Sequence, residues 1–115
     1  MAVLNEHNKK ATEGLKPAIA KHLSEIEKAC QKRFVHRLYA FGSVNTERFK
    51  ETSDIDLIVD FFALPPEQYA DNYFDLCEDL EAIFNRKVDL VTTKSIKNPY
   101  FQRELEQTKQ LIYAA

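Results

Sequence analysis

The sequence predicts an α/β (α+β) protein in which a small mixed sheet of at least three strands carries helices mainly on one face. Apolar residues recur at helical spacing in three segments, and they alternate with polar residues in the segment 54–62. The chain has 115 residues, 44% of them hydrophobic, and this length can close one core but not two. We therefore expect a single domain over residues 1–115.

The first expected helix runs from about residue 13 to residue 32. Its apolar residues recur at steps of three and four and therefore share one stripe; they are Leu15, Ile19, Leu23, Ile26 and Cys30. Residues 34–41, FVHRLYAF, then favour a strand because β-branched and aromatic residues dominate, and Gly42 ends it. A helix followed by a strand thus opens the predicted fold.

Residues 54–62, DIDLIVDFF, form the clearest expected strand. Apolar residues alternate along it, so that Asp54, Asp56 and Asp60 share the opposite face. The apolar density of this segment is the highest among the expected strands. We therefore expect it to lie centrally in the sheet.

Two prolines, Pro65 and Pro66, end this strand and open a helix over about residues 66–84, because proline is tolerated near the start of a helix. An Asn-Arg turn then leads into the short strand 87–91, KVDLV. Asn98 and a following proline suit the cap and first position of a last helix. A helical stripe extends this helix to the C-terminus, through Phe101, Leu105, Thr108 and Ile112.

Composition and charge exclude several classes of protein. No run approaches the ~18 apolar residues of a membrane helix, and the first ten residues lack a signal-peptide block, so we expect a cytoplasmic protein. A net charge of −2 without a continuous basic groove argues against nucleic acid as a partner. Cys30 and Cys77 fall on apolar helical positions, which predicts two reduced, packed thiols.

Three aspartates form the first candidate site. Asp54 and Asp56 project from one face of a strand with Cα atoms about 6.6 Å apart, and Asp89 can join them if the two strands pair. Crowded carboxylates repel one another, and a divalent cation is the natural compensation. Oxygen ligands alone favour Mg²⁺ or Mn²⁺ over zinc.

Gly42 and Ser43 form the second candidate site, at the end of the first strand. Glycine lets a backbone approach a ligand closely, and N–H groups at such a turn, together with the serine hydroxyl, suit an anion. Ten residues, 44–53, separate Ser43 from the first aspartate and can return the chain beside the first strand. Phosphate donors and metal ligands would then face one crevice, as phosphoryl or nucleotidyl transfer requires.

The combined motifs resemble a known superfamily. AFGSVNTERFKETSDIDLIVDF, followed by RKVDLV and NPYFQRELEQTKQLIYAA, is similar to nucleotidyltransferases with a polymerase-beta-like palm. The likeness covers about residues 34–115 and is closer still to the minimal nucleotidyltransferases that act as antitoxins of HEPN toxins. This resemblance implies a polymerase-beta-palm-like fold.

The resemblance also implies the roles of single residues. Gly42 and Ser43 would bind the triphosphate of ATP, while Asp54, Asp56 and Asp89 would be the catalytic acids and the ligands of two Mg²⁺ ions. A hydroxyl, implied to belong to a tyrosine of a HEPN-type toxin, would attack the α-phosphate with loss of pyrophosphate. Asp89 would help to remove the proton of that hydroxyl.

Two other readings stay open from the residues. The chain can be a weak or inactive binding module that neutralises a partner protein by covering it with aromatic side chains, namely Tyr69, Tyr73, Tyr100, Phe101 and Tyr113. Among these we expect Tyr73 and Phe101 to belong to the core instead. The last helix can also support self-association into a homo-oligomer.

Overall fold

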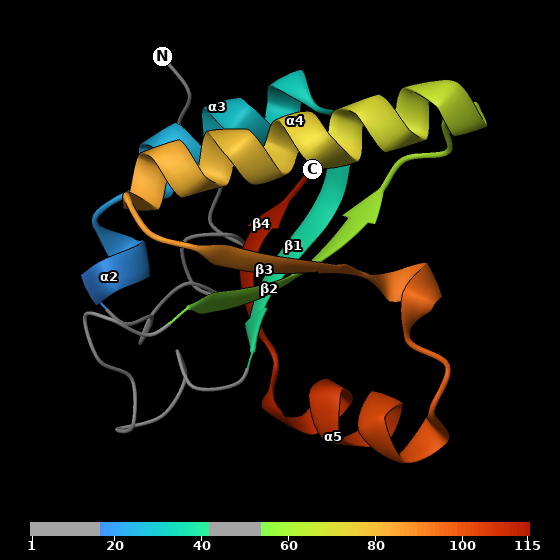
Figure 1. The fold of residues 1–115 in the computed structure, drawn as a ribbon. Coiled ribbons are helices and arrows are strands. Elements are labelled where there is room, and N and C mark those ends of the chain that lie inside the picture. Colours follow the sequence, from blue (N-terminus) through green and yellow to red (C-terminus); the bar gives the residue numbers. More distant parts are fainter. Residues whose placement is uncertain (1–16, 42–53) are drawn as a thin grey trace.

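The computed structural model describes residues 17–41 and 54–115. Helices and strands follow one another in an order that is close to the prediction (Figure 1). They are α2 (Pro17–Ala20), α3 (Leu23–Lys32), β1 (Val35–Phe41), β2 (Ile55–Phe61), α4 (Pro66–Phe84), β3 (Val88–Thr92), the short 3₁₀-helix η2 (Thr93–Ser95), α5 (Pro99–Thr108) and β4 (Gln110–Ala114).

The strands form one four-stranded sheet with the order β3-β2-β1-β4. β1 pairs antiparallel with β2 and with β4, whereas β2 pairs parallel with β3. The predicted mixed sheet is therefore confirmed. β2 has a neighbour on each side, so its predicted central position is confirmed as well.

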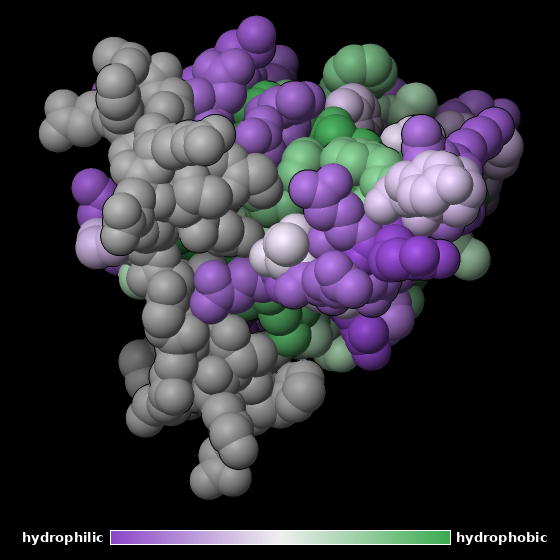
Figure 2. Space-filling model, turned by 90° about the horizontal axis from the view of Figure 1, so that it is seen from below, coloured by the Kyte–Doolittle hydropathy of each residue, from purple (hydrophilic) through white to green (hydrophobic). Residues whose placement is uncertain are grey.

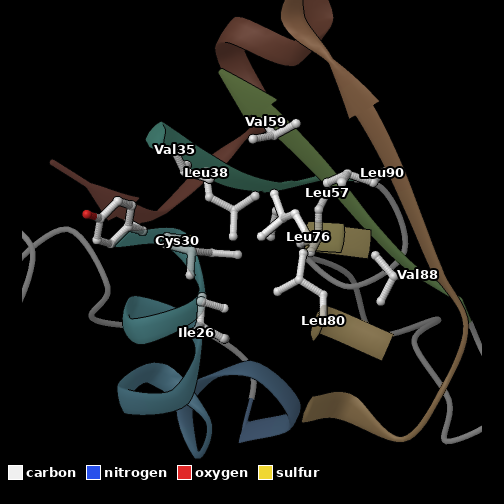
Figure 3. Close-up of a cluster of buried hydrophobic side chains, with 14 of the residues drawn as sticks. Ile26, Cys30, Val35, Leu38, Leu57, Val59, Leu76, Leu80, Val88 and Leu90 are labelled. Atoms are coloured by element: carbon white, nitrogen blue, oxygen red, sulfur yellow. The ribbon is translucent and has the colours of Figure 1, made fainter. Parts of the chain in front are cut away.

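Helices α3 and α4 lie side by side over one face of the sheet (Figure 1). Figure 3 shows apolar side chains from both helices and from the strands pointing toward one another, among them Ile26, Leu38, Leu57 and Leu80. Cys30 belongs to this core, and both cysteines are free thiols, as predicted. The face with two helices is therefore the core face.

The expected helix over residues 13–32 is interrupted where the structure describes it. α2 ends at Ala20, and α3 begins at Leu23 after a turn in which the His22 N–H donates to the carbonyl of Ile19. The His22 ring packs edge-on against Phe84 of α4 at a centroid distance of 5.6 Å. Residues 13–16 of the predicted helix lie outside the described residues.

The predicted last helix is wrong beyond residue 108. α5 ends at Thr108, Lys109 is already extended, and residues 110–114 form β4 against β1. The helical stripe placed Ile112 beside Leu105, but the run Leu-Ile-Tyr favours a strand, and β1 would otherwise lie at an open edge. As part of β4, Ile112 is buried in the main core. The last helix of the described chain is therefore α5, which is shorter than predicted.

α5 lies on the other side of the sheet from α3 and α4 (Figure 1). Asn98 caps it, as predicted: its side-chain oxygen accepts from the N–H of Tyr100 at 2.9 Å and of Phe101 at 3.2 Å. Among the described residues, no helix has both the length and the apolar character needed to cross a bilayer. The sheet thus has a core face and a second face that α5 covers only in part.

Candidate active site

Asp56 of β2 and Asp89 of β3 are direct neighbours in the sheet. The parallel register pairs these two residues, and neighbouring strands lie about 4.8 Å apart. Ile55 and Leu57 flank Asp56 and are buried in the core, as are Val88 and Leu90 on either side of Asp89. Because side chains alternate along a strand, both aspartates emerge on the opposite face, on the side of α5.

Asp56 lies within electrostatic range of both other aspartates. Burial raises the pKa of Asp56, and the negative charges of Asp89 and Asp54 raise it further. Asp54 lies just before β2 and is exposed, whereas Asp56 is half-buried. Repulsion among these carboxylates is what a bound cation would relieve.

The donor atoms at this position fit magnesium. Among residues 17–41 and 54–115, no group of three or more His, Cys, Asp or Glu side chains is placed to hold a metal ion. Mg²⁺ does not require one, because it is usually held by one or two carboxylates, several waters and the phosphates of a substrate. Asp56 and Asp89 supply such a carboxylate pair, and Asp54 lies within electrostatic reach.

The predicted phosphate site lies outside the described residues. Gly42 and Ser43 follow Phe41, the last residue of β1. Phe41 is in register with Asp56 on the neighbouring strand. The last described residue before Gly42 therefore lies beside Asp56 in the sheet.

Several other acidic side chains of the described residues pair with groups outside the three aspartates. Asp60 lies further along β2 and contacts the His36 ring nitrogen and the Thr93 hydroxyl, each at 3.3 Å. On α4, Asp75 and Asp79 form ion pairs with Arg33 at 3.4 and 2.9 Å. Asp60 and Asp75 are both partly exposed.

The aromatic residues divide between core and surface. Tyr113 is buried and Tyr73 packs against the core, so the prediction for Tyr73 is confirmed. The prediction for Phe101 is wrong: its side chain is 40% exposed and its ring meets that of Phe41 at 6.4 Å. Phe101 lies on α5, which packs beside the open face of the sheet and not over the main core, so its place in a helical stripe did not bury it.

A groove of about 410 Å³ lies between β2 and α5, and none of the three aspartates lines it. Ile58, which follows Asp56 on the same face of β2, contributes to its wall, and η2, α5 and the residues directly after each of these helices supply the rest. The residues include two cations, Arg103 and Lys109; Lys109 pairs with Glu106 at 2.7 Å and lies 4.2 Å from the centre of the Tyr39 ring. Figure 2 looks onto this side and shows apolar side chains between hydrophilic ones. The sequence analysis missed the groove, because no local pattern places α5 over this face.

Comparison with known proteins gives a family and a fold. The model of the family described as polymerase beta, nucleotidyltransferase, matches residues 24–115. A protein of Methanocaldococcus jannaschii, provisionally named a protein adenylyltransferase, is 38% identical over 101 residues, which cover 81% of this chain and 98% of that protein.

Solved structures support the same fold. A toxin-antitoxin crystal structure with AMP-PNP aligns with a TM-score of 0.61 and 20% identity, over 81% of this chain and 73% of the matched chain. The complex of a tri-AMPylated Shewanella oneidensis HEPN toxin with its MNT antitoxin aligns with a TM-score of 0.57 and 18% identity, over 84% and 72%. At these identities the likeness shows the fold, and it agrees with the mixed sheet described above.

Proposed function

Because the chain belongs to the polymerase beta nucleotidyltransferase family, we propose that it is an Mg²⁺-dependent enzyme that moves AMP from ATP to a hydroxyl of a partner protein. The observation that carries this proposal is the paired position of Asp56 and Asp89 on the open face of the sheet. A relative that is 38% identical bears the name of a protein adenylyltransferase, which supports AMP as the transferred group.

The three aspartates hold the metal in this proposal. Asp54, Asp56 and Asp89 would bind two Mg²⁺ ions, which draw charge from the phosphate oxygens and align the α-phosphate. Asp56 would lie at the centre, because the charges of both other aspartates reach it. Gly42 and Ser43 would hold the triphosphate with their N–H groups and the serine hydroxyl.

The reaction balances as a single displacement. The acceptor oxygen forms a bond with the α-phosphorus while the bond from that phosphorus to the bridging oxygen breaks, and pyrophosphate leaves with that oxygen. Asp89 takes the hydroxyl proton as the new bond forms. The groove that Ile58 lines, two residues along β2 from Asp56, would receive part of one of the two reactants.

The acceptor is a tyrosine of a HEPN-type toxin, so that the chain acts as an antitoxin. Solved structures of the same fold support this choice, since one is a toxin-antitoxin with AMP-PNP and another holds an AMPylated HEPN toxin. The hydroxyl of tyrosine is a suitable nucleophile once a carboxylate removes its proton. The attached AMP would disable the toxin.

Label transfer tests the proposal. The protein is incubated with Mg²⁺, ATP labelled in the α-phosphate and a HEPN-type toxin. We expect label on the toxin, and none when Asp56→Asn or Asp89→Asn replaces the wild type. Asp71→Asn, at an exposed position of α4, is the matched control and should transfer normally. Equal labelling by the wild type and both site variants would overturn the proposal.

A binding module is the second candidate, and exposed aromatic side chains favour it. Tyr100 is 81% exposed and Phe101 40% exposed, both at the start of α5. Exposed aromatic residues are typical anchors of protein interfaces. Neutralisation of the toxin without label, by the wild type and by Asp56→Asn alike, would favour this function over transfer.

A further inference from the structure

The outer edge of β3 is held by side chains of α4. Among residues 17–41 and 54–115, β3 is the last strand on its side of the sheet, so its outward backbone groups have no strand partner there. Three residues of α4 reach them, and these residues are spaced by four positions, which places them on one side of the helix: Tyr73, Cys77 and Glu81. We call these three residues the edge clamp.

The hydrogen bonds of the edge clamp fall on the residues directly before and after Asp89. The Tyr73 hydroxyl donates to the carbonyl of Leu90 at 2.6 Å, and the N–H of Val88 donates to the Glu81 carboxylate at 3.2 Å. The Cys77 thiol adds a weak contact, at 4.0 Å, with the carbonyl of Val88. The edge clamp therefore binds backbone groups of β3 on both sides of Asp89.

The other edge of β3 is held by β2. The parallel register runs from Val88 to Thr92, and the N–H of Ile55 donates to the carbonyl of Lys87 at 3.0 Å. A five-residue strand at the edge of a sheet has few contacts of its own, and such elements open locally at low cost. The alignment of Asp89 with Asp56 therefore depends on both the pairing of β3 with β2 and the edge clamp.

We propose that Tyr73 and Glu81 are positioning residues, which fix the carboxylate of Asp89 next to Asp56 for a divalent cation. This inference rests on the proposed function. Ligands of a metal must be held to within a fraction of an ångström, and partners behind them tune affinity strongly. The clamp acts through the backbone of β3, since its hydrogen bonds end on the residues before and after Asp89.

If the edge clamp only stabilised the fold, its variants would behave differently. Covering an edge strand also prevents its pairing with other chains. If the clamp did only this, its loss would lower the melting temperature and promote aggregation but leave metal affinity unchanged. Metal affinity at a temperature well below the melting transition therefore separates the two roles.

The test is a Mn²⁺ titration of the full chain by calorimetry, with Mn²⁺ as the probe. Tyr73→Phe removes only the hydroxyl, and Glu81→Ala removes the acceptor of the Val88 N–H. We expect each to weaken Mn²⁺ binding on the order of tenfold. Glu81→Gln keeps an acceptor oxygen and should bind nearly as the wild type does. Glu78→Ala, an exposed position on the same helix, is the matched control.

The same substitution made in an Asp89→Asn variant shows whether the clamp acts through Asp89. In Asp89→Asn the further change Tyr73→Phe should no longer alter Mn²⁺ affinity. Hydrogen exchange of the β3 amides, measured without metal, should be faster in Glu81→Ala and shows that the clamp has been released. Equal Mn²⁺ affinity of the wild type and the clamp variants, despite faster exchange, would overturn the positioning role only. Absence of Mn²⁺ binding by the wild type would overturn the proposed function and this role with it.

Discussion

Phe41 at the end of β1 and Asp56 on β2 lie opposite each other in the antiparallel register, while Asp89 lies beside Asp56 on the parallel side. Asp56 thus lies between Phe41, the last residue of β1, and Asp89, the third aspartate. Asp56 is also the residue on which the charges of Asp89 and Asp54 act.

Replacement of Asp56 should stabilise the metal-free protein at neutral pH. Burial, Asp89 and Asp54 raise the pKa of Asp56, so the folded state binds this proton more tightly than the unfolded chain does. Stability is therefore lost as the pH rises from the ordinary carboxyl pKa through the raised one. We expect Asp56→Asn to gain less than about 1 kcal/mol at pH 7, because solvent screens a half-buried group.

Urea unfolding at two pH values checks this prediction. The gain from Asp56→Asn should be present at pH 7 and absent at about pH 3, below the ordinary carboxyl pKa. Asp71→Asn serves as the control, because its carboxylate is exposed on α4. A gain of the same size at both pH values would mean that the charge of Asp56 is not its cause.

Divalent cations should stabilise the folded protein through the aspartates. A ligand present at one hundred times its dissociation constant adds about 2.7 kcal/mol, which corresponds to a rise of roughly 10 °C in the melting temperature of a chain of this size. Thermal unfolding with Mg²⁺ or with a chelator measures this rise. Asp89→Asn should lose most of it, and an equal rise in that variant would place the cation elsewhere.

Ile112 tests the correction at the C-terminus. As a residue of β4 it is only 1% exposed and packs in the main core. Ile112→Ala should therefore lower the free energy of unfolding by about 2–4 kcal/mol. Gln107→Ala, at an exposed position of α5, should change it little. If denaturant unfolding gave the same small loss for both variants, residues 110–114 would not form a core strand.

The cap of α5 is the subject of a fourth prediction. The Asn98 side chain accepts two backbone hydrogen bonds at the start of this helix. Asn98→Ala should cost about 1 kcal/mol of stability, and Asn98→Asp should retain most of it because aspartate also caps helices well. Denaturant unfolding measures both variants. A loss of the same size in Asn98→Asp would argue that the capping bonds are not the source of the stability.

Local signals in the sequence determined most of the element bounds. The helix expected over residues 66–84 is present at those bounds, and Asn85, which the sequence placed in a turn, adopts the left-handed conformation that ends a helix. Alternation along residues 54–62 correctly separated core residues from aspartates. Such features depend on residues that are close in the chain, so local sequence patterns are enough to predict them.

Features that depend on distant contacts could not be read in the same way. Residues 110–114 form a strand because β1 offers them an edge, and a helical pattern in the same residues concealed it. The meeting of Asp56 with Asp89 was predicted only on the condition that their strands pair, since strand order is a property of the whole sheet. The edge clamp joins residues of α4 to backbone groups, which leave no pattern in the side chains of β3.

A crystal structure of the protein with Mn²⁺ and a non-hydrolysable ATP analogue tests the central claim most directly. Anomalous scattering locates Mn²⁺ without assumptions about its ligands. The account predicts an anomalous peak between the carboxylates of Asp56 and Asp89, bridged to the phosphates of the analogue. A bound analogue whose manganese peak lies away from both carboxylates would contradict it.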